Sequence, residues 1–558
     1  MSTATQKPTP QSGADLLVHS LEAQGVKYVF GVPGAKVDKV FDSLVDSAIQ
    51  TVVCRHEQNA AFLASGVGRM TGKAGVALVT SGPGCSNLVT GFATATSEGD
   101  PVVGIGGAVP VADRLKQLHQ SMDTINLFRP IAKFSAEIDS PGAVPEVVAN
   151  AFRAAESGRP GAAFISAPKD IMAAKADGRV LTPAPSQNLG PADASAIQEA
   201  ARLIGQAKLP VLLLGLLAST KDAAEAVGAF IAKGNLPVVC TYQGAGIVPR
   251  EQFERFGGRV GLFRTQPADV LLDAADLVIT IGYDPIEYEP GLWNLGKNRG
   301  IIHIDAVPSD VDKDYRAQVE LIGNIAATVR ALTAHVKPPL TDTAAPLLRA
   351  VAQDRAAFAD QAAAMNGLPV HPMRLVHELQ GLLSGDMTVC LDMGSFHIWL
   401  ARHLYSFRAR QILMTNGQQT LGAGLPWAIA ACLVRPGEKV MSISGDGGFL
   451  FSAMELETAV RLKCNLVHLV WIDGYYDMVG LQEKAKYGRL SGVKLGPVDL
   501  MKYAEAFGAK GLKIESPDQI TSTLKKAFAM EGPVLVGVNV DYRDNHKLME
   551  MVHPEVLD

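Results

Sequence analysis

The stretch SGDGGF (residues 444–449) places one carboxylate, Asp446, among glycines. It directly follows the apolar, alternating run KVMSIS (residues 439–444), which predicts a β-strand. Because a strand that ends in a glycine turn brings its backbone close to a bound ligand, an acid here suits a cation or a hydroxyl better than it suits packing. Asp446 is therefore a candidate ligand-binding residue.

A second acid follows one strand later. Residues 448–472 contain an amphipathic helix (MELETAVRL) and another buried strand, after which the chain reads DGYYD and places Asp473. Such a βαβ unit puts Asp446 and Asp473 at adjacent strand ends that face the same crevice. Two carboxylates, a main-chain carbonyl and two phosphate oxygens fit the octahedral oxygen shell of Mg²⁺. The spacing predicts a magnesium site that holds a diphosphate, whereas two unrelated solvated acids would leave the spacing unexplained.

Three further stretches follow strand-like runs and are weaker candidates. GVPGAK (residues 31–36) is compatible with a substrate- or phosphate-contacting turn, but an ordinary strand-to-helix turn explains it equally well. TSGPGCSN (residues 80–87) opens a helix whose backbone N–H groups can face an anion or a polar substrate. In RHEQNAAF (residues 55–62), Glu57 lies where a strand ends and a helix begins. Acids are common there because the helix dipole stabilises them, so Glu57 alone is a weak catalytic candidate.

The composition narrows the class of protein. Of the 558 residues, 47% are hydrophobic and 19% are charged, so the chain can bury a large core. At about 150 residues per domain, this length indicates roughly three or four domains. The net charge of −5, without clusters of Lys and Arg, disfavours nucleic-acid binding. The six cysteines form no CxxC pair, the N-terminus lacks an apolar signal core, and no apolar run reaches the ~20 residues of a membrane span. A reducing, cytoplasmic location is expected.

The elements that must position these residues follow a regular pattern. Short, continuous apolar runs alternate with Ala-rich helical stretches, which indicates parallel sheets covered on both faces. Two Pro- and Ala-rich stretches without periodicity, residues 175–195 and 336–346, divide the chain. The predicted fold class is α/β, with three doubly wound parallel-sheet domains in series over residues 12–178, 192–336 and 368–545. Ligands of such sheets bind at the carboxyl ends of strands, where the glycine turns fall.

The GDG motif, followed by Asp473 after a helix and a strand, resembles the signature of thiamine-diphosphate enzymes. Glu57, in its strand–RHE–helix context, is similar to the activating glutamate of that family, and the order of the three domains also agrees. Within the family, the chain looks like the catabolic, FAD-independent acetolactate synthases. The stretches that carry this resemblance are GVPGAKVDKVFDSL, RHEQNAAF, TSGPGCSNL, HQSMDT, DMGSFHIWLARHLYSFRARQ, NGQQTLGAGLPWAIA and SGDGGFLFSAMELETAVRL.

The biosynthetic synthases typically carry a Trp after the metal motif, and they bind FAD on the middle domain. The corresponding stretch here, MVGLQEKAKYGR (residues 478–489), has no Trp. The resemblance therefore implies an enzyme that needs thiamine diphosphate and Mg²⁺ and has no FAD. It also implies that the first domain binds the pyrimidine end of the cofactor and the third domain its diphosphate end.

The resemblance implies roles for four residues around the reacting part of the cofactor. Glu57 would hydrogen-bond the aminopyrimidine ring and favour its imino form, whose exocyclic nitrogen takes the thiazolium C2 proton. The main-chain carbonyl of Gln419 would accept a hydrogen bond from that nitrogen. Leu421 would wedge the cofactor into its bent shape, in place of a Met of similar volume. Gln120, with the SGPG turn, would face the substrate.

The implied metal ligands are Asp446, Asp473 and the main-chain carbonyl of Tyr475. The family pattern has Asn and Gly where this chain has Gly474 and Tyr475, and Asn where it has Asp477. The resemblance also implies a set of cofactor contacts, some of them through backbone groups. These are Glu57, Pro33, Ser395, Phe396, His397, Gln419, Leu421, Gly445, Asp446, Gly447, Gly448, Asp473, Tyr475, Tyr476 and Met478.

The implied activity is that of an acetolactate synthase. Pyruvate is decarboxylated, and the resulting hydroxyethyl–cofactor carbanion condenses with a second pyruvate to give 2-acetolactate and CO2. The implied assembly is a homodimer or a dimer of dimers with shared active sites. The alternatives are another thiamine-diphosphate 2-oxoacid decarboxylase or carboligase, and a catalytically silent cofactor-binding paralogue. The altered DGYYD loop favours the silent paralogue, and the intact Glu57 disfavours it. A nicotinamide dehydrogenase is disfavoured because no GxGxxG follows a strand.

Overall fold

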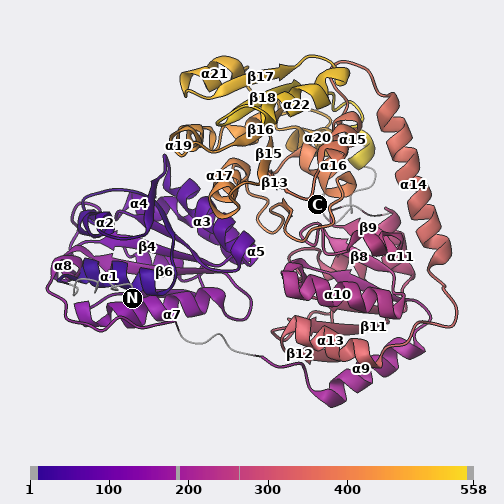
Figure 1. Ribbon diagram of the computed structural model, residues 1–558, viewed down its shortest axis with the longest axis horizontal. Coiled ribbons are helices and arrows are strands. Elements are labelled where there is room, and N and C mark those ends of the chain that lie inside the picture. Colours follow the sequence, from indigo (N-terminus) through magenta and orange to yellow (C-terminus); the bar gives the residue numbers. More distant parts are fainter. Residues whose placement is uncertain (1–10, 184–188, 263, 265, 550–558) are drawn as a thin grey trace, which may run out of the picture. The chain divides into compact units, whose positions relative to one another are not determined.

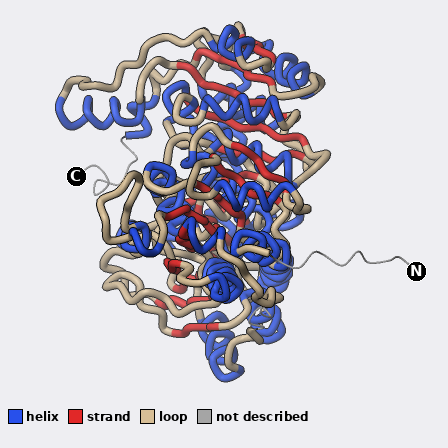
Figure 2. Tube along the Cα trace, turned by 90° about the vertical axis from the view of Figure 1, so that its left-hand side faces the viewer, coloured by secondary structure: helices blue, strands red, loops and turns tan. Residues whose placement is uncertain are grey.

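The chain contains three six-stranded sheets, and every strand pair within them is parallel. A computed structural model describes residues 11–183, 189–262, 264 and 266–549. Helices cover the sheets (Figures 1 and 2). The predicted α/β class, with three parallel-sheet domains in series, is confirmed. The chain forms two compact units: the first (Met1–Gln187 and Ile429–Val434) holds the first sheet, and the second (Asn188–Ala428 and Arg435–Asp558) holds the other two.

The first sheet, in indigo and purple in Figure 1, has the strand order β2-β1-β3-β4-β6-β5. Its central strands are apolar throughout, as strands covered on both faces must be. Its strands are β1 (Tyr28–Val32), β2 (Gln50–Val53), β3 (Gly75–Val79), β4 (Val102–Ala108), β5 (Phe134–Glu137) and β6 (Ala162–Pro168). The helices of this part are α1 (Gly13–Ala23), α2 (Asp38–Val45), α3 (Glu57–Thr71), α4 (Pro83–Asn87), α5 (Val89–Glu98), α6 (Thr124–Phe128), α7 (Val144–Glu156) and α8 (Lys169–Ala173).

The second sheet has the order β12-β11-β10-β7-β8-β9. This is the order of doubly wound dinucleotide-binding sheets, in which the order of successive strands reverses between β7 and β10. Its strands are β7 (Pro210–Leu214), β8 (Val238–Thr241), β9 (Phe256–Val260), β10 (Leu277–Ile281), β11 (Gly300–Asp305) and β12 (Val319–Ile322). The α-helices are α9 (Ala194–Gln206), α10 (Lys221–Gly234), α11 (Pro267–Ala274), α12 (Pro290–Trp293), α13 (Ile325–His335) and α14 (Ala345–Ala364).

The third sheet, in orange and yellow, has the order β14-β13-β15-β16-β18-β17, which repeats the connectivity of the first sheet. Its strands are β13 (Met387–Leu391), β14 (Ile412–Leu413), β15 (Lys439–Gly445), β16 (Leu466–Ile472), β17 (Lys510–Ile514) and β18 (Val534–Asn539). The α-helices are α15 (Pro372–Leu382), α16 (Ser395–His403), α17 (Gly424–Val434), α18 (Asp446–Phe449), α19 (Leu456–Arg461), α20 (Asp477–Tyr487), α21 (Leu500–Ala506), α22 (Ile520–Phe528) and α23 (Asn545–Met549).

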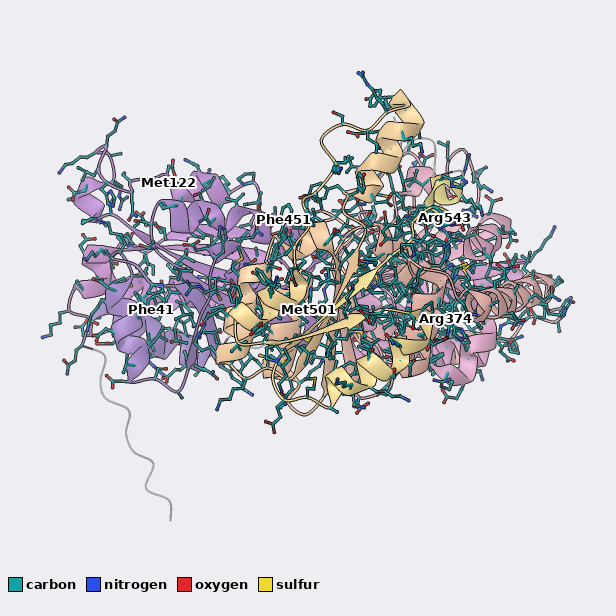
Figure 3. All side chains as sticks on the ribbon, turned by 90° about the horizontal axis from the view of Figure 1, so that it is seen from above. Phe41, Met122, Arg374, Phe451, Met501 and Arg543 are labelled. Carbon is teal, nitrogen blue, oxygen red and sulfur yellow. The ribbon has the colours of Figure 1, made fainter. Side chains whose placement is uncertain are left out.

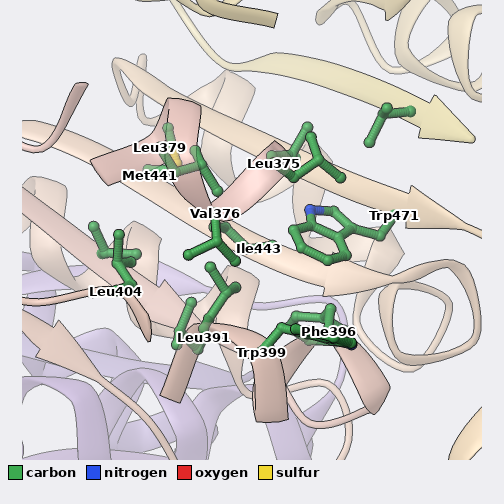
Figure 4. Packing of buried hydrophobic residues seen from close by; sticks show 14 of the residues in the cluster. Leu375, Val376, Leu379, Leu391, Phe396, Trp399, Leu404, Met441, Ile443 and Trp471 are labelled. Atoms are coloured by element: carbon green, nitrogen blue, oxygen red, sulfur yellow. The ribbon is translucent and has the colours of Figure 1, made fainter. Parts of the chain in front are cut away.

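Helix α15 shows how a helix covers this sheet. Its residues Leu375, Val376 and Leu379 lie on one side of the helix and are buried. They point toward strand residues that include Met441 and Ile443 (Figure 4). Burial of each such side chain stabilises the fold by about 1.5–3 kcal/mol. The sheet is thereby held rigid beneath the turns at its carboxyl edge.

Of the two expected linkers, one lies partly outside the described residues and the other is described in full. The stretch 175–195 includes residues 184–188, which lie outside the described residues. The stretch 336–346 is irregular until α14 begins at Ala345, and this long helix packs against α11 and α15. The domain boundaries 12–178, 192–336 and 368–545 stay predictions. In the described part of the chain, no helix has both the length and the apolar character needed to cross a membrane.

Candidate active site

The two strand-end acids of the third domain lie together, as their spacing predicts. Strands β15 and β16 are neighbours, with Gly445 paired to Trp471, so Asp446 and Asp473 follow them at one edge of the sheet. The two carboxyl groups are hydrogen-bonded to each other. Asp446 also accepts the N–H of Gly474 (2.9 Å) and of Gly447 (3.1 Å). The acids form one site and are not separately solvated turn residues.

The electrostatics of this pair favour a bound cation. Burial raises the pKa of both carboxyl groups, and the neighbouring charge of Asp446 raises the pKa of Asp473 further, with a smaller effect of Asp477. Two carboxyl groups that are hydrogen-bonded to each other cannot both ionise cheaply unless a proton or a cation lies between them. A hard divalent cation with oxygen ligands removes the repulsion. The donor set therefore fits Mg²⁺.

Gly447 and Gly448 at the GDG turn pack so closely against neighbouring side chains that a larger residue would clash. A Cβ at Gly447 would lie 2.6 Å from the Tyr476 ring, and one at Gly448 would lie 2.9 Å from Asp392 Oδ2. Within residues 11–183, 189–262, 264 and 266–549, no three His, Cys, Asp or Glu side chains form a metal-binding group. A cation at Asp446 and Asp473 would thus need main-chain and ligand oxygens to complete its shell.

The loop that carries the third predicted metal ligand is held by a segment that the sequence did not point to. Tyr476 N–H donates to the carbonyl of Val493 (2.9 Å), and Leu495 N–H donates to the carbonyl of Gly474 (2.8 Å). Gly474 has φ +76°, a left-handed conformation that Gly and Asn adopt more readily than other residues. A glycine at position 474 therefore suits this backbone conformation. A cavity of about 730 Å³ beside it is lined by both acids and Tyr475.

The start of α16 is tied to the same loop through Asp477. Its Oδ2 accepts hydrogen bonds from Ser395 Oγ (2.5 Å) and Asn545 Nδ2 (2.7 Å). The side chains of Phe396 and His397 point into the core, where Phe396 lies near Trp471 (Figure 4). Any contact of Phe396 or His397 with a ligand at the sheet edge must therefore come from their backbone. Burial lowers the pKa of His397 to about 4, so its imidazole is neutral.

The loop between β14 and α17 brings two further predicted residues to the GDG turn. Gln419 is exposed and has φ +47°, a left-handed backbone conformation that is sparsely populated by residues other than glycine. Leu421 is half-buried, and a Cβ on Gly448 would lie 3.6 Å from Leu421 Cδ2. Phe451, just after the turn, is 45% exposed (Figure 3) and would lie 2.7 Å from a Cβ on Gly422. Leu421 and the GDG turn thus form one surface.

Beneath the GDG turn, a buried imidazole connects the two strands. His468 on β16 is hydrogen-bonded through Nδ1 to Ser442 Oγ and through Nε2 to Ser444 Oγ (2.9 Å), both on β15. Burial lowers its pKa to about 3. The neutral ring fixes the last residues of β15 just before Asp446.

The first domain places Glu57 at the beginning of α3, directly after β2. His56 caps the helix, because its Nδ1 accepts the N–H of Gln58 (3.1 Å). Asn87 Nδ2, at the end of α4, donates to Glu57 Oε2 (2.9 Å). A Cβ on Gly84 would lie 3.6 Å from Glu57 Oε1. The carboxylate therefore faces the SGPG turn and keeps Oε1 turned toward it.

The other predicted residues of the first domain gather at the same turn. Gly34, next to the exposed Pro33, approaches Thr80 so closely that a Cβ would lie 2.6 Å from the Thr80 Cβ. Gln120 has φ +61°, and its Oε1 accepts a hydrogen bond from Ser81 Oγ (3.2 Å). The structure thus joins the GVPG turn, the SGPG turn and Gln120 at the carboxyl edge of the first sheet.

Sequence reasoning missed three polar residues that shape these sites. They are Asn87, which contacts Glu57, and the acids Asp392 and Asp477. Asp392 is fully buried directly after β13, and burial raises its pKa to about 7. An acid directly after an apolar strand was the signal that identified Asp446 and Asp473, and it would have identified Asp392 as well. Nothing in the sequence marks Asn87 as a partner of Glu57.

Family models match all three parts of the chain. The N-terminal TPP binding domain of thiamine pyrophosphate enzymes matches residues 11–127, the central domain matches 197–332, and the C-terminal TPP binding domain matches 392–538. The last of these includes the GDG turn, and the first includes Glu57. The chain belongs to the family of thiamine pyrophosphate enzymes.

Full-length relatives identify the branch of that family. The chain is 52% identical to the catabolic acetolactate synthase of Raoultella terrigena, over 97% of each protein. It is 49% identical to the acetolactate synthase of Bacillus subtilis (strain 168), over 96% of this chain and 94% of that protein. It is 31% identical to the large subunit of acetolactate synthase isozyme 2 of Escherichia coli (strain K12), over 96% of each. The similarity to the acetolactate synthases spans all three domains.

Proposed function

We propose that this protein is an acetolactate synthase that decarboxylates pyruvate and joins the remaining two-carbon unit to a second pyruvate, giving 2-acetolactate and CO2. The full-length similarity to relatives named acetolactate synthase carries this proposal. The intact Glu57 and the paired acids Asp446 and Asp473 are the polar groups that such chemistry requires at the carboxyl edges of the first and third sheets. The six cysteines are free thiols, which agrees with the proposed cytoplasmic location.

Bound thiamine diphosphate supplies the electron sink that this reaction needs. Asp446, Asp473 and the carbonyl of Tyr475 would hold Mg²⁺, and Gly447, Gly448 and the start of α16 would contact the diphosphate, partly through backbone groups. Tyr476 and Met478 would complete its surroundings. Leu421 would press against the cofactor from the loop before α17.

In the first domain, Glu57 would hydrogen-bond the pyrimidine ring and favour its imino form. Asn87 orients the carboxylate by donating to Oε2, which leaves Oε1 for the ring. Gln120 and the SGPG turn would face the substrate, and Pro33 would contact the cofactor. The main-chain carbonyl of Gln419 would accept a hydrogen bond from the exocyclic nitrogen of the cofactor.

The proposal includes the absence of bound FAD. The turn after β7 reads GLLAS and lacks the GxGxxG pattern that is typical of dinucleotide-binding turns at this position. The purified protein should have no flavin absorbance near ~450 nm, and added FAD should not raise its activity. Release of stoichiometric FAD on denaturation would contradict this part of the proposal.

Product identification tests the proposed activity. The protein is incubated with pyruvate, thiamine diphosphate and Mg²⁺, and the products are identified by mass spectrometry. Acetolactate and CO2 are the expected products. Acetaldehyde would identify a decarboxylase, and no turnover would identify a silent cofactor-binding protein, so either result would overturn the proposal.

We also propose a homodimer, or a dimer of dimers, whose active sites combine Glu57 of one subunit with Asp446 of another. Consider a Glu57→Ala chain mixed with an Asp446→Ala chain, each inactive alone. In a heterodimer, one shared site carries both lesions and the other carries neither. Two-fold symmetry therefore predicts recovery of up to about half of the wild-type activity per heterodimer.

The heterodimer is isolated with two different affinity tags, and its acetolactate production is compared with that of each parent homodimer. A mixture of two Glu57→Ala chains with different tags is the matched control and should stay inactive. If the isolated heterodimer has no activity, each site is built within one chain and the shared-site model fails.

A further inference from the structure

The loop of residues 416–423 has an unusual backbone conformation. It runs without regular secondary structure from β14 to α17, and it carries both Gln419 and Leu421. Gln419 and Gly422 have φ +47° and +90°, so the loop holds two left-handed residues close together. A non-glycine residue keeps such a conformation only when its surroundings enforce it. The contacts at the two ends of the loop show what enforces it here.

At its C-terminal end, the loop is held by the buried carboxylate of Asp392. Asp392 Oδ1 accepts the N–H of Gly422 (2.8 Å) and the N–H of Met393 (2.9 Å), and Ala423 N–H also donates to this carboxylate. The other oxygen, Oδ2, lies against Gly448. Asp392 N–H donates to the carbonyl of Ile443, which anchors the residue to the sheet. One carboxylate therefore connects the loop, the GDG turn and β13.

At its N-terminal end, the loop is held by the second sheet. Asn416 Nδ2 donates to the main-chain carbonyl of Glu287 (2.7 Å). The side chain of Glu287 is only 3% exposed. Its carboxylate accepts Leu216 N–H through both oxygens (3.0 Å each), Thr241 Oγ1 (2.6 Å) and Asp284 N–H (3.2 Å). These bonds leave Glu287 little freedom, so the carbonyl that receives Asn416 is fixed.

Glu287 occupies a notable place in the second sheet. Leu216 begins the turn after β7, at the switch between β7 and β10. In sheets of this order, the N–H groups after the first strand receive the phosphates of a dinucleotide. Here the carboxylate of Glu287 accepts the N–H of Leu216, and a Cβ on Gly215 would lie 2.7 Å from Glu287 Oε1. The Leu216 N–H is thus used by the chain's own anchor residue.

We propose that Asp392 and Glu287 are positioning residues that fix the two ends of loop 416–423 and thereby place the Gln419 carbonyl and Leu421 for the reaction. This inference rests on the proposed function, because it assigns the loop its task. It adds two residues whose side chains touch neither the metal ligands nor the reacting atoms. It also gives the second domain a part in the active site of the third.

The test uses variants that loosen one end of the loop at a time. Asp392→Ala removes the acceptor at the C-terminal end, and Asn416→Ala removes the donor to Glu287 while leaving the Glu287 carboxylate in place. Asp392→Asn keeps an oxygen that can accept from Gly422 and is the conservative rescue. Asp269→Asn is the matched control, because Asp269 is a buried carboxylate of the same unit that accepts Gln266 N–H (3.0 Å) and is not hydrogen-bonded to the loop.

The first readout is amide hydrogen exchange of a peptide covering residues 416–423 in the full-length protein without cofactor. Because a bond to a charged group is lost, exchange in Asp392→Ala is expected to rise about tenfold or more, and Asn416→Ala should raise it about fivefold. Asp392→Asn and Asp269→Asn should leave it within about twofold of wild type. The second readout is the dissociation constant of thiamine diphosphate, which should rise in the two Ala variants.

Steady-state kinetics separates positioning from general destabilisation. If the loop places the Gln419 carbonyl, Asn416→Ala should lower kcat about tenfold while KM for pyruvate changes less than about threefold. Unchanged exchange, unchanged cofactor affinity and unchanged kcat in Asn416→Ala would overturn the proposal, even if Asp392→Ala fails to fold. Hydrogen exchange does not depend on the reaction. If the variants loosen the loop in a protein that makes no acetolactate, the proposed function is contradicted, but Asp392 and Glu287 still fix the loop.

Discussion

Replacing Glu57 by Gln is expected to lower turnover about 10²–10⁴-fold while thiamine diphosphate still binds. The carboxylate is oriented by Asn87 and faces the SGPG turn, where it can shift a proton on the pyrimidine ring. Gln has nearly the same shape, but it has no negative charge and cannot act as the base. The proposed metal ligands Asp446 and Asp473 follow strands of a different sheet, so the diphosphate should keep its ligands. Steady-state kinetics and calorimetric titration with cofactor measure the two effects.

The matched control for this variant is Asp38→Asn. Asp38 is the first residue of α2, in the same unit as Glu57, and it is exposed. It shares with Glu57 the stabilising position at a helix N-terminus but lies on a different turn. The control should keep wild-type turnover. A Glu57→Gln enzyme that retains most of its activity would remove Glu57 from the mechanism.

Replacing Asp446 by Ala is expected to weaken cofactor binding about 100-fold or more, since even outer-shell changes at metal sites cost about 10–100-fold. Asp446 is also the acceptor for the N–H groups of Gly474 and Gly447, so the variant loosens both loops that would surround the metal. Calorimetric titration with Mg²⁺ and thiamine diphosphate measures the loss.

Asp499→Asn is the control for Asp446→Ala. Asp499 lines the same cavity, but it caps α21 by accepting the N–H of Met501 (3.2 Å), and Asn can do the same. Cofactor affinity should be unchanged in this control. Wild-type affinity in Asp446→Ala itself would mean that Asp446 is not a metal ligand.

The sequence carried most of the fold and part of the site. Central strands such as β3 and β4 are continuously apolar because both faces are covered, and such runs can be read from the chain. The edge strands β5 (FSAE) and β17 (KGLKI) are half-exposed, carry charged residues and have no such run, so they were missed. The repeated connectivity of the first and third sheets also depends on these edge strands.

For the site, sequence reasoning worked where the chain itself sets the geometry. Asp446 and Asp473 each follow one of the two neighbouring strands β15 and β16, whose pairing brings the strand ends together. The partners of Glu57 and Asn416 depend on contacts between segments far apart in the sequence, Asn87 for Glu57 and Glu287 for Asn416. Periodicity does not report such contacts. The roles of the individual site residues stay predictions that the variants above test.

The hydrogen-bonded ring of His468 makes the third domain sensitive to acid. An unfolded histidine takes up a proton near pH 6.5, whereas His468 stays neutral in the folded chain to about pH 3 and His397 to about pH 4. Unfolding therefore consumes protons below pH 6.5, and mass action pulls the chain toward the unfolded state as the pH falls. Each imidazole lowers the free energy of unfolding by about 1 kcal/mol per pH unit between pH 6.5 and its pKa in the folded chain. Thermal unfolding at pH 7 and pH 5 should show this loss, and His468→Asn should reduce the difference between the two pH values.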